Sequence, residues 1–141
     1  MARQPVMDAT EVQAFLEEVF PQQNGRMSVE AVGPLTARMR MPVAYENLRP
    51  GGTVSGPSMF TLADCAFYVA VLAMIGRQAL TVTTNLNINF LRKPPEADLI
   101  AEARILKLGR TLATGDVSVF SDGLADPVAH ATVTYAIPPA K

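Results

Sequence analysis

The chain has 141 residues, of which 49% are hydrophobic and 18% charged, with 12 basic against 13 acidic side chains. This composition excludes a disordered chain, and a formal charge of −1 argues against a nucleic-acid-binding protein because no net positive charge attracts phosphates. The length predicts a single domain over residues 1–141, with an N-terminal helix and linker over 1–24. The single cysteine and the lack of an apolar stretch in MARQPVMDAT both favour the cytoplasm.

An amphipathic helix is predicted over residues 9–20. Asp8 and Glu11 have the spacing of a capping box, in which each side chain accepts a hydrogen bond from the backbone of the other residue. Hydrophobic side chains then recur at helical intervals: Val12, Phe15, Leu16, Val19 and Phe20. Pro21 follows directly, so the helix is expected to end there.

Two short strands are expected after this helix. In residues 35–41, apolar side chains alternate with threonine and arginine, which is the pattern of a half-buried strand. Residues 27–32 precede it, and Gly33-Pro34 between the two segments favours a hairpin turn. The next residues, 46–57, read ENLRPGGTVSGP and predict a loop.

A long apolar helix is predicted between this loop and Gly76. Pro57 suits the first turn of a helix, and Gly76 suits a C-terminal cap. The segment from Ser58 to Ile75 approaches the length of a membrane span, but no basic flank or aromatic belt accompanies it. A helix that is apolar on all sides is also what a sheet wrapped around it requires. We therefore expect a buried helix and no membrane.

Four further strands complete the predicted order, and they cover residues 80–92, 97–108, 110–121 and 127–137. One helix, two strands, a long helix and four strands are most simply arranged as an α+β fold, in which an antiparallel sheet curls around one buried helix.

The strand over residues 80–92 is predicted to have two contrasting faces. Alternation assigns Val82, Leu86, Ile88 and Phe90 to one face. It assigns Thr81, Thr83, Asn85, Asn87 and Asn89 to the other. Neutral polar side chains suggest that this second face meets another subunit or a ligand; an ordinary solvated face is the alternative.

Asp64 is the first candidate for chemistry, because it is the only charge between Ser58 and Ile75. A carboxylate in an apolar helix is unfavourable unless it is paired, hydrogen-bonded or used. Such a carboxylate can serve as a general base. The alternative is that Asp64 bonds a neighbouring threonine or backbone group and only fixes the helix register.

Ser55-Gly56-Pro57 is the second candidate. A glycine at a helix start lets a ligand approach free N–H groups, where the helix dipole favours negative charge, as in an oxyanion hole; a plain glycine turn is the alternative. Gly56 and Asp64 are eight positions apart, about 12 Å along a helix axis, so one helix cannot bring both to the same carbonyl. If they cooperate, Gly56 must come from a second copy of the chain.

Other polar or reactive side chains are weaker candidates for a functional role. Cys65 is expected to be a small core residue, since no histidine is near it in sequence. His130 alternates with threonines on the last strand, and as the only histidine it cannot build a conventional metal cluster, so no metal is expected. A loose group of basic side chains can hold an anionic ligand or simply occupy exposed strand ends: Arg92, Lys93, Arg104, Lys107 and Arg110.

Four segments carry a resemblance to a known family: SGPSMFTLAD (55–64), TNLNINFL (84–91), LIAEARILKLGRTLATGDVSVF (99–120) and AHATVTYAI (129–137). Through them residues 27–138 resemble hotdog-fold acyl-CoA thioesterases, most closely the PaaI-like, phenylacetate-degradation type. The resemblance implies a sheet wrapped around the central helix, dimers with shared active sites, and often tetramers. It implies no cofactor other than the coenzyme A of the substrate.

The resemblance also implies roles for individual residues. Asp64 would activate water or attack the thioester carbonyl, and the N–H of Gly56 from the opposite subunit would bind the oxyanion. Thr83 would assist beside the carboxylate.

The chain departs from the family pattern at two positions. Ser55-Gly56-Pro57 stands where His-Gly-Gly is common, and Arg49 stands where an asparagine is common. We expect Arg49 to orient the substrate and Ser55 to assist the oxyanion segment, with Asn85, Arg92 and Arg110 as further substrate-binding candidates.

The favoured interpretation is hydrolysis of an acyl-CoA to a carboxylic acid and free coenzyme A. A non-catalytic acyl-CoA- or lipid-binding protein is the alternative, favoured by the absent histidine and asparagine. A hotdog hydratase is disfavoured, because no histidine lies on the helix side to act as partner acid.

Overall fold

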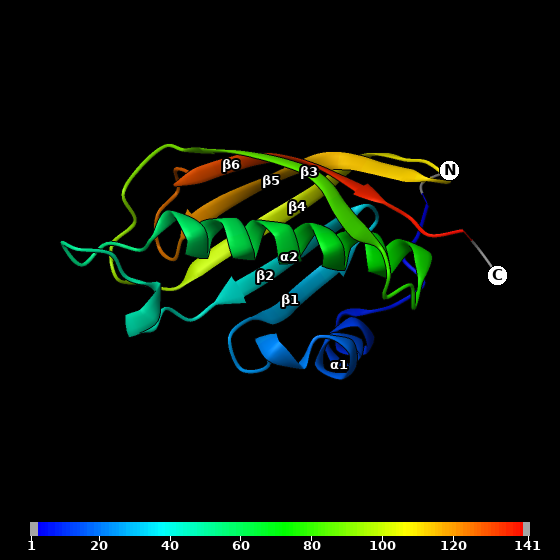
Figure 1. Ribbon diagram of the computed structural model, residues 1–141, viewed down its shortest axis with the longest axis horizontal. Helices are drawn as coiled ribbons and strands as arrows, with labels where there is room; N and C mark the ends of the chain where they lie inside the picture. Colours follow the sequence, from blue (N-terminus) through cyan, green and yellow to red (C-terminus); the bar gives the residue numbers. More distant parts are fainter. Residues whose placement is uncertain (1–2, 140–141) are drawn as a thin grey trace.

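The computed structural model describes residues 3–139, in which a six-stranded antiparallel sheet wraps around one long helix (Figure 1). The sheet has the strand order β1-β2-β4-β5-β6-β3. The elements are α1 (Ala9–Val19), β1 (Ser28–Gly33), β2 (Thr36–Met41), α2 (Gly56–Ile75), β3 (Val82–Phe90), β4 (Leu99–Leu108), β5 (Leu112–Ser121) and β6 (Ala129–Ala136). Short 3-10 turns lie at Pro21–Gln23 and Tyr45–Asn47. This architecture confirms the predicted α+β hotdog fold.

Helix α1 covers the β1 edge of the sheet. Its capping box is present as predicted, with Asp8 accepting from the Glu11 N–H and Glu11 accepting from the Asp8 N–H. Val12 and Phe15 are buried against the core. The Gln13 side-chain oxygen accepts a 2.7 Å hydrogen bond from the backbone N–H of Val29 in β1. An edge strand normally leaves such groups free to pair with another strand, so α1 partly blocks this edge.

Helix α2 is the core around which the other elements pack. The Ser55 hydroxyl caps its start by accepting from the Ser58 N–H, and Gly76 ends it with a φ of +94°. By length and composition α2 could cross a membrane, but 72% of its apolar stretch is buried inside the fold, as a core helix is. In the interior of α2 the side chains that escape burial form one stripe at helical spacing: Pro57, Phe60, Thr61 and Asp64.

A bulge in β3 changes which side chains face α2. Thr83 lies opposite Tyr135 of β6, but the register then shifts, and Asn85 lies opposite Thr134. Directly opposed residues share a face, so Thr83 shares the inner face with buried Tyr135, whereas Asn85 points outward with Thr134. The prediction that Thr83 and Asn85 share a face is therefore wrong, as is the grouping of Val82 with Leu86. Strict alternation fails because the bulge inserts one residue, Thr84.

Gly115 of β5 allows α2 to approach the sheet closely. A Cβ built on Gly115 would lie 2.7 Å from Cε1 of Phe67 and would also clash with the backbone oxygen of Arg104. Phe67 is fully buried in α2, one turn beyond Asp64. The missing side chain at Gly115 thus helps to fix the position of the helix that carries Asp64.

We expect Gly115→Ala to lower the free energy of unfolding by about 2 kcal/mol or more, because the added methyl overpacks the contact with Phe67 and a backbone atom. Ser118→Ala, on the outward side of the same strand, is the matched control and should change stability little. Urea unfolding of both variants measures the difference. Equal stability of the two would contradict the close-packing argument.

Candidate active site

Two hydroxyl groups hold the Asp64 carboxylate. Thr83 Oγ1 donates a 2.7 Å hydrogen bond to Oδ1 of Asp64. The Tyr135 hydroxyl lies 2.7 Å from the same Oδ1 and 2.9 Å from the main-chain oxygen of Asp64. Within residues 3–139 no hydrogen bond reaches Oδ2. One carboxylate oxygen is therefore anchored, and the other has no hydrogen bond from the described residues.

The surroundings of Asp64 keep its neighbours protonated. Burial, and then the charge of Asp64, raise the pKa of the Tyr135 hydroxyl far above its usual range, so that this group is a donor at any ordinary pH. Burial and the same charge raise the pKa of Cys65 to about 12. A thiol is a nucleophile only as thiolate, so Cys65 is a small core residue, as predicted.

A hollow of about 450 Å³ opens beside Asp64. Its walls come from α1 and the following turn, from α2, from the start of β3 and from β6: Val19, Phe20, Gln22, Asp64, Cys65, Tyr68, Ala79, Thr81, Val82, Thr83 and Tyr135. Apolar, aromatic and polar side chains share these walls about equally. The hollow thus presents one carboxylate on a surface that is partly apolar and partly polar.

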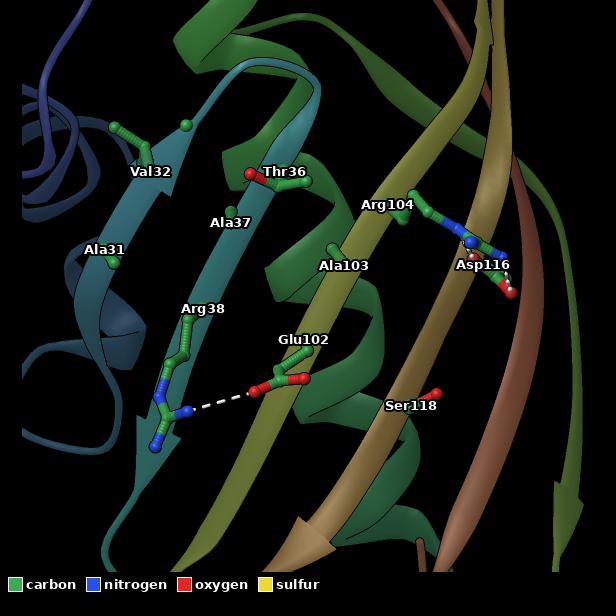
Figure 2. A pocket seen from close by; sticks show the side chains of 11 residues that line it. Ala31, Val32, Thr36, Ala37, Arg38, Glu102, Ala103, Arg104, Asp116 and Ser118 are labelled. Carbon is green, nitrogen blue, oxygen red and sulfur yellow. Dashed lines mark hydrogen bonds and ion pairs between the residues drawn. The ribbon is translucent and has the colours of Figure 1, made fainter.

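A slightly larger hollow, about 510 Å³, lies on the outer face of the sheet (Figure 2). Its charged side chains are paired with one another: Arg38 with Glu102 at 3.0 Å, and Arg104 with Asp116 at 3.2 Å. His130, a catalytic candidate in the sequence, lies 3.0 Å from Asp116 in the same cluster. Burial alone would raise the pKa of Asp116, but hydrogen bonds from His130 and Arg104 outweigh it and lower that pKa. The charged side chains of this hollow are therefore bonded to one another and not directed at a ligand. The hollow beside Asp64 is the better candidate for an active site.

A cluster of hydrogen-bonded polar residues stabilises the start of α2. Asn47 accepts from the backbone N–H of Ser55 at 2.7 Å and donates through its side chain to Ser58 Oγ at 3.1 Å. The Ser55 and Ser58 hydroxyls lie 2.9 Å apart. The N–H of Gly56 is the first of α2 and has no acceptor inside the helix. Among residues 3–139 the N–H of Gly56 makes no hydrogen bond, so it is a donor free to bind a ligand.

The predicted site residues fall into separate groups. Only Asp64 and Thr83 line the same hollow. Gly56 and Ser55 lie two turns earlier in α2, about 12 Å away along the axis, so a single chain does not join them to Asp64. Asn85 is exposed on the outer face of β3.

The three predicted arginines also lie apart from the hollow. Arg49 is exposed in the loop before α2, and Arg110 is exposed in the β4–β5 turn. Arg92 follows β3 and donates to the backbone oxygen of Pro127.

Sequence reasoning missed Tyr135 and Asn47. Tyr135 follows three small inward residues of β6 (Ala129, Ala131 and Val133), and this change to a large hydroxyl-bearing side chain was the available signal. The contacts of Asn47 with the start of α2 gave no local signal, because Ser55 and Ser58 are eight and eleven residues away in sequence.

Comparison with known proteins shows to which family the chain belongs. The model of the family described as "Thioesterase superfamily" matches residues 51–128, more than half of the chain. A solved "putative thioesterase" from Silicibacter sp. TM1040 is 53% identical with a TM-score of 0.91, over 99% of this chain and 97% of that one. A mutant of the phenylacetic acid degradation protein PaaI from Thermus thermophilus is 28% identical with a TM-score of 0.73, over 84% of this chain and 99% of that one.

A curated relative agrees with this assignment. The "Putative esterase" of Halobacterium salinarum is 35% identical over 98 residues, which are 66% of this chain and 64% of that protein. The match thus spans less than two thirds of that relative's length. These relationships support thioester hydrolysis in general, and the chain belongs to the thioesterase superfamily, as the resemblance in the sequence predicts.

Proposed function

We propose that this protein hydrolyses an acyl-CoA thioester to a carboxylic acid and free coenzyme A. The observation that carries the proposal is the Asp64 carboxylate, whose Oδ1 is held by Thr83 and Tyr135 while Oδ2 accepts no hydrogen bond from residues 3–139. A carboxylate oriented in this way can take a proton from water at a reacting carbonyl. No metal or other cofactor enters the proposed reaction.

The proposed reaction is one water-consuming acyl transfer. Water at Oδ2 gives a proton to Asp64 while its oxygen adds to the thioester carbonyl carbon. The carbonyl oxygen becomes an oxyanion, which the N–H of Gly56 from a second copy stabilises. The carbon–sulfur bond then breaks, and the coenzyme A thiolate leaves with the proton from Asp64. Direct attack by Oδ2, followed by hydrolysis of the resulting anhydride, is the variant of the same chemistry.

The edge formed by β3 supports a site shared between two copies. Both β1 and β3 are edge strands, but α1 partly covers β1 through Gln13, whereas β3 is largely exposed. Large apolar side chains lie exposed along or beside β3, with Val82 54% and Phe90 51% accessible. An exposed edge of this kind is a template for pairing with a second strand.

Antiparallel pairing of two β3 strands would join the separated halves of the site. Full-length pairing sets Val82 of one copy opposite Phe90 of the other. Within one chain, a Cβ on Gly56 would lie 3.1 Å from the Phe90 ring, so Gly56 adjoins the end of β3. Asp64 is bonded to Thr83 near the start of β3. The pairing therefore brings Gly56 of the second copy toward Asp64 of the first.

The uncovered stripe of α2 fits the same dimer. Phe60 and Thr61 lie on that stripe between Gly56 and Asp64, and a second copy on the β3 edge would cover it. We propose a homodimer as the active unit, or a tetramer built from two such dimers.

The basic loops at the start of α2 are our proposed site for the coenzyme A phosphates. The loop that holds Arg49 and the segment after β3 that holds Arg92 are joined by a hydrogen bond from the Val54 N–H to the Pro94 oxygen at 3.0 Å. Exposed guanidinium groups can bind phosphates through paired N–H donors. Contact with the substrate remains a prediction for three further residues: Ser55, Asn85 and Arg110.

A non-catalytic acyl-CoA-binding protein is the alternative function. It is favoured by the serine and arginine that replace the family's common histidine and asparagine at positions 55 and 49. Turnover of a panel of acyl-CoA esters separates the two functions, because a binding protein would hold the esters without releasing free thiol.

We expect Asp64→Asn to lower kcat by about 100-fold or more, because the amide cannot accept the proton from water. The change is nearly isosteric, so the fold should persist. Release of free coenzyme A measures the loss, and Asp126→Asn, at an exposed position, is the matched control. Near-normal turnover in the Asp64 variant would refute its assignment.

Mixing two inactive variants tests the shared site. Chains with Asp64→Asn and chains with Gly56→Val should each be inactive alone. Random exchange in an equal mixture makes about half of the dimers mixed, and each mixed dimer regains one of its two sites, so about a quarter of the original activity should return. Folded mixed dimers without activity would show that the site is not shared.

Tyr135→Phe should lower kcat about tenfold with little change in KM, because Asp64 loses one of the two hydroxyls that orient it. Tyr68→Phe is the control: it lines the same hollow but donates to the Ala79 oxygen, so its effect on kcat should be smaller. If both variants behave alike, the contact of Tyr135 with Asp64 has no part in orienting the carboxylate.

A further inference from the structure

One wall of the Asp64 hollow comes from the N-terminal segment. Val19, Phe20 and Gln22 line it opposite residues of α2 and β3. These three residues precede the part of the chain that the family model matches, residues 51–128. The carboxylate and this wall therefore come from different parts of the fold, and the wall can vary without disturbing the chemistry.

A second hollow lies behind Phe20. It measures about 20 Å³, room for about one water molecule, and lies among α1, the following turn and β2. Its walls include Leu16, Met27 and Met39, which are apolar. Phe20 and Cys65 line both this inner hollow and the large one beside Asp64. These two side chains therefore lie between the hollow beside Asp64 and the small hollow.

Of these two residues, Phe20 is the one whose side chain can set how deep the hollow beside Asp64 is. Cys65 lies in the rigid centre of α2 and has a small side chain. Phe20 follows the last residue of α1, only half buried, with its N–H bonded to the Leu16 oxygen at 2.7 Å. Behind it, the flexible side chains of Met27 and Met39 can adjust to a guest more easily than branched side chains can.

We propose that Phe20 limits the length of the acyl group by closing the inner end of the acyl pocket. The inference rests on the proposed acyl-CoA hydrolysis and adds the class of substrate: compact or short acyl groups, which end at the Phe20 ring. Loss of that ring joins the two hollows and extends the pocket between α1 and the sheet, along Leu16 and Met39. Longer straight-chain acyl groups then become substrates.

The test compares Phe20→Ala with the unchanged protein on saturated acyl-CoA esters from butanoyl to dodecanoyl. The ratio of kcat/KM for the longest ester to that for the shortest should rise at least about tenfold, as expected when about two more methylene groups are buried. Phe120→Ala, which removes a phenylalanine ring from the outer face of the sheet, is the matched control and should leave the ratio unchanged. An unchanged ratio in a folded, active Phe20→Ala protein overturns the proposal.

Two further measurements keep the test decisive. Phe20→Leu is a milder variant for use if the alanine protein does not fold, and its ratio should rise in the same direction. Binding of the same esters, measured by calorimetry in an Asp64→Asn background, does not depend on turnover. If the unchanged protein releases no coenzyme A from any ester, the proposed function fails. The Phe20 proposal still stands if Phe20→Ala selectively strengthens binding of the longest ester, and falls if it does not.

Discussion

Burial of α2 on nearly all sides is the constraint on which the rest of the structure depends. A helix of 20 residues with a single charged side chain must be covered by apolar surface, and in this chain the sheet that curves around it provides that surface. Gly115 lets that sheet approach Phe67 closely, so the position of the helix is tightly fixed. A charge placed on such a helix is fixed in position too. The rigidity that stabilises the core also orients Asp64.

The polar contacts of Asp64 come from the sheet and not from the helix. Thr83 and Tyr135 face each other across the β3–β6 pair, and both reach the same oxygen of Asp64. The bulge at Thr84 makes this possible while the rest of β3 keeps Leu86 and Ile88 on the inner face. An unbroken strand that placed Thr83 inward would have turned those apolar residues outward. The bulge therefore resolves a conflict between the site and the core.

The sequence predicts the elements well because their signals are local. The capping box at Asp8 and the glycine at the end of α2 each act within a few residues, and both are confirmed, as are the four strands predicted after α2. The bulge in β3 could not be predicted, since alternation carries no sign of an inserted residue. Tyr135 is 71 residues from Asp64 in sequence, so only the tertiary fold reveals their contact. Asp64 could be singled out from the sequence, because an isolated charge in an apolar helix stands out, but the hydroxyl of Tyr135 that contacts it could not.

The N-terminal helix contacts both an edge of the sheet and the hollow beside Asp64. Through Gln13 it occupies a backbone donor of β1, which leaves β3 as the more accessible edge for a second copy. Through Val19 and Phe20, at its end, it forms a wall of the hollow beside Asp64. Both effects depend on how α1 is anchored, by its capping box at one end and by the buried Phe15 in its middle. A change in α1 that leaves α2 and the sheet intact can therefore alter how far the β1 edge is exposed and how the hollow is shaped, while the carboxylate and its two hydroxyls stay in place.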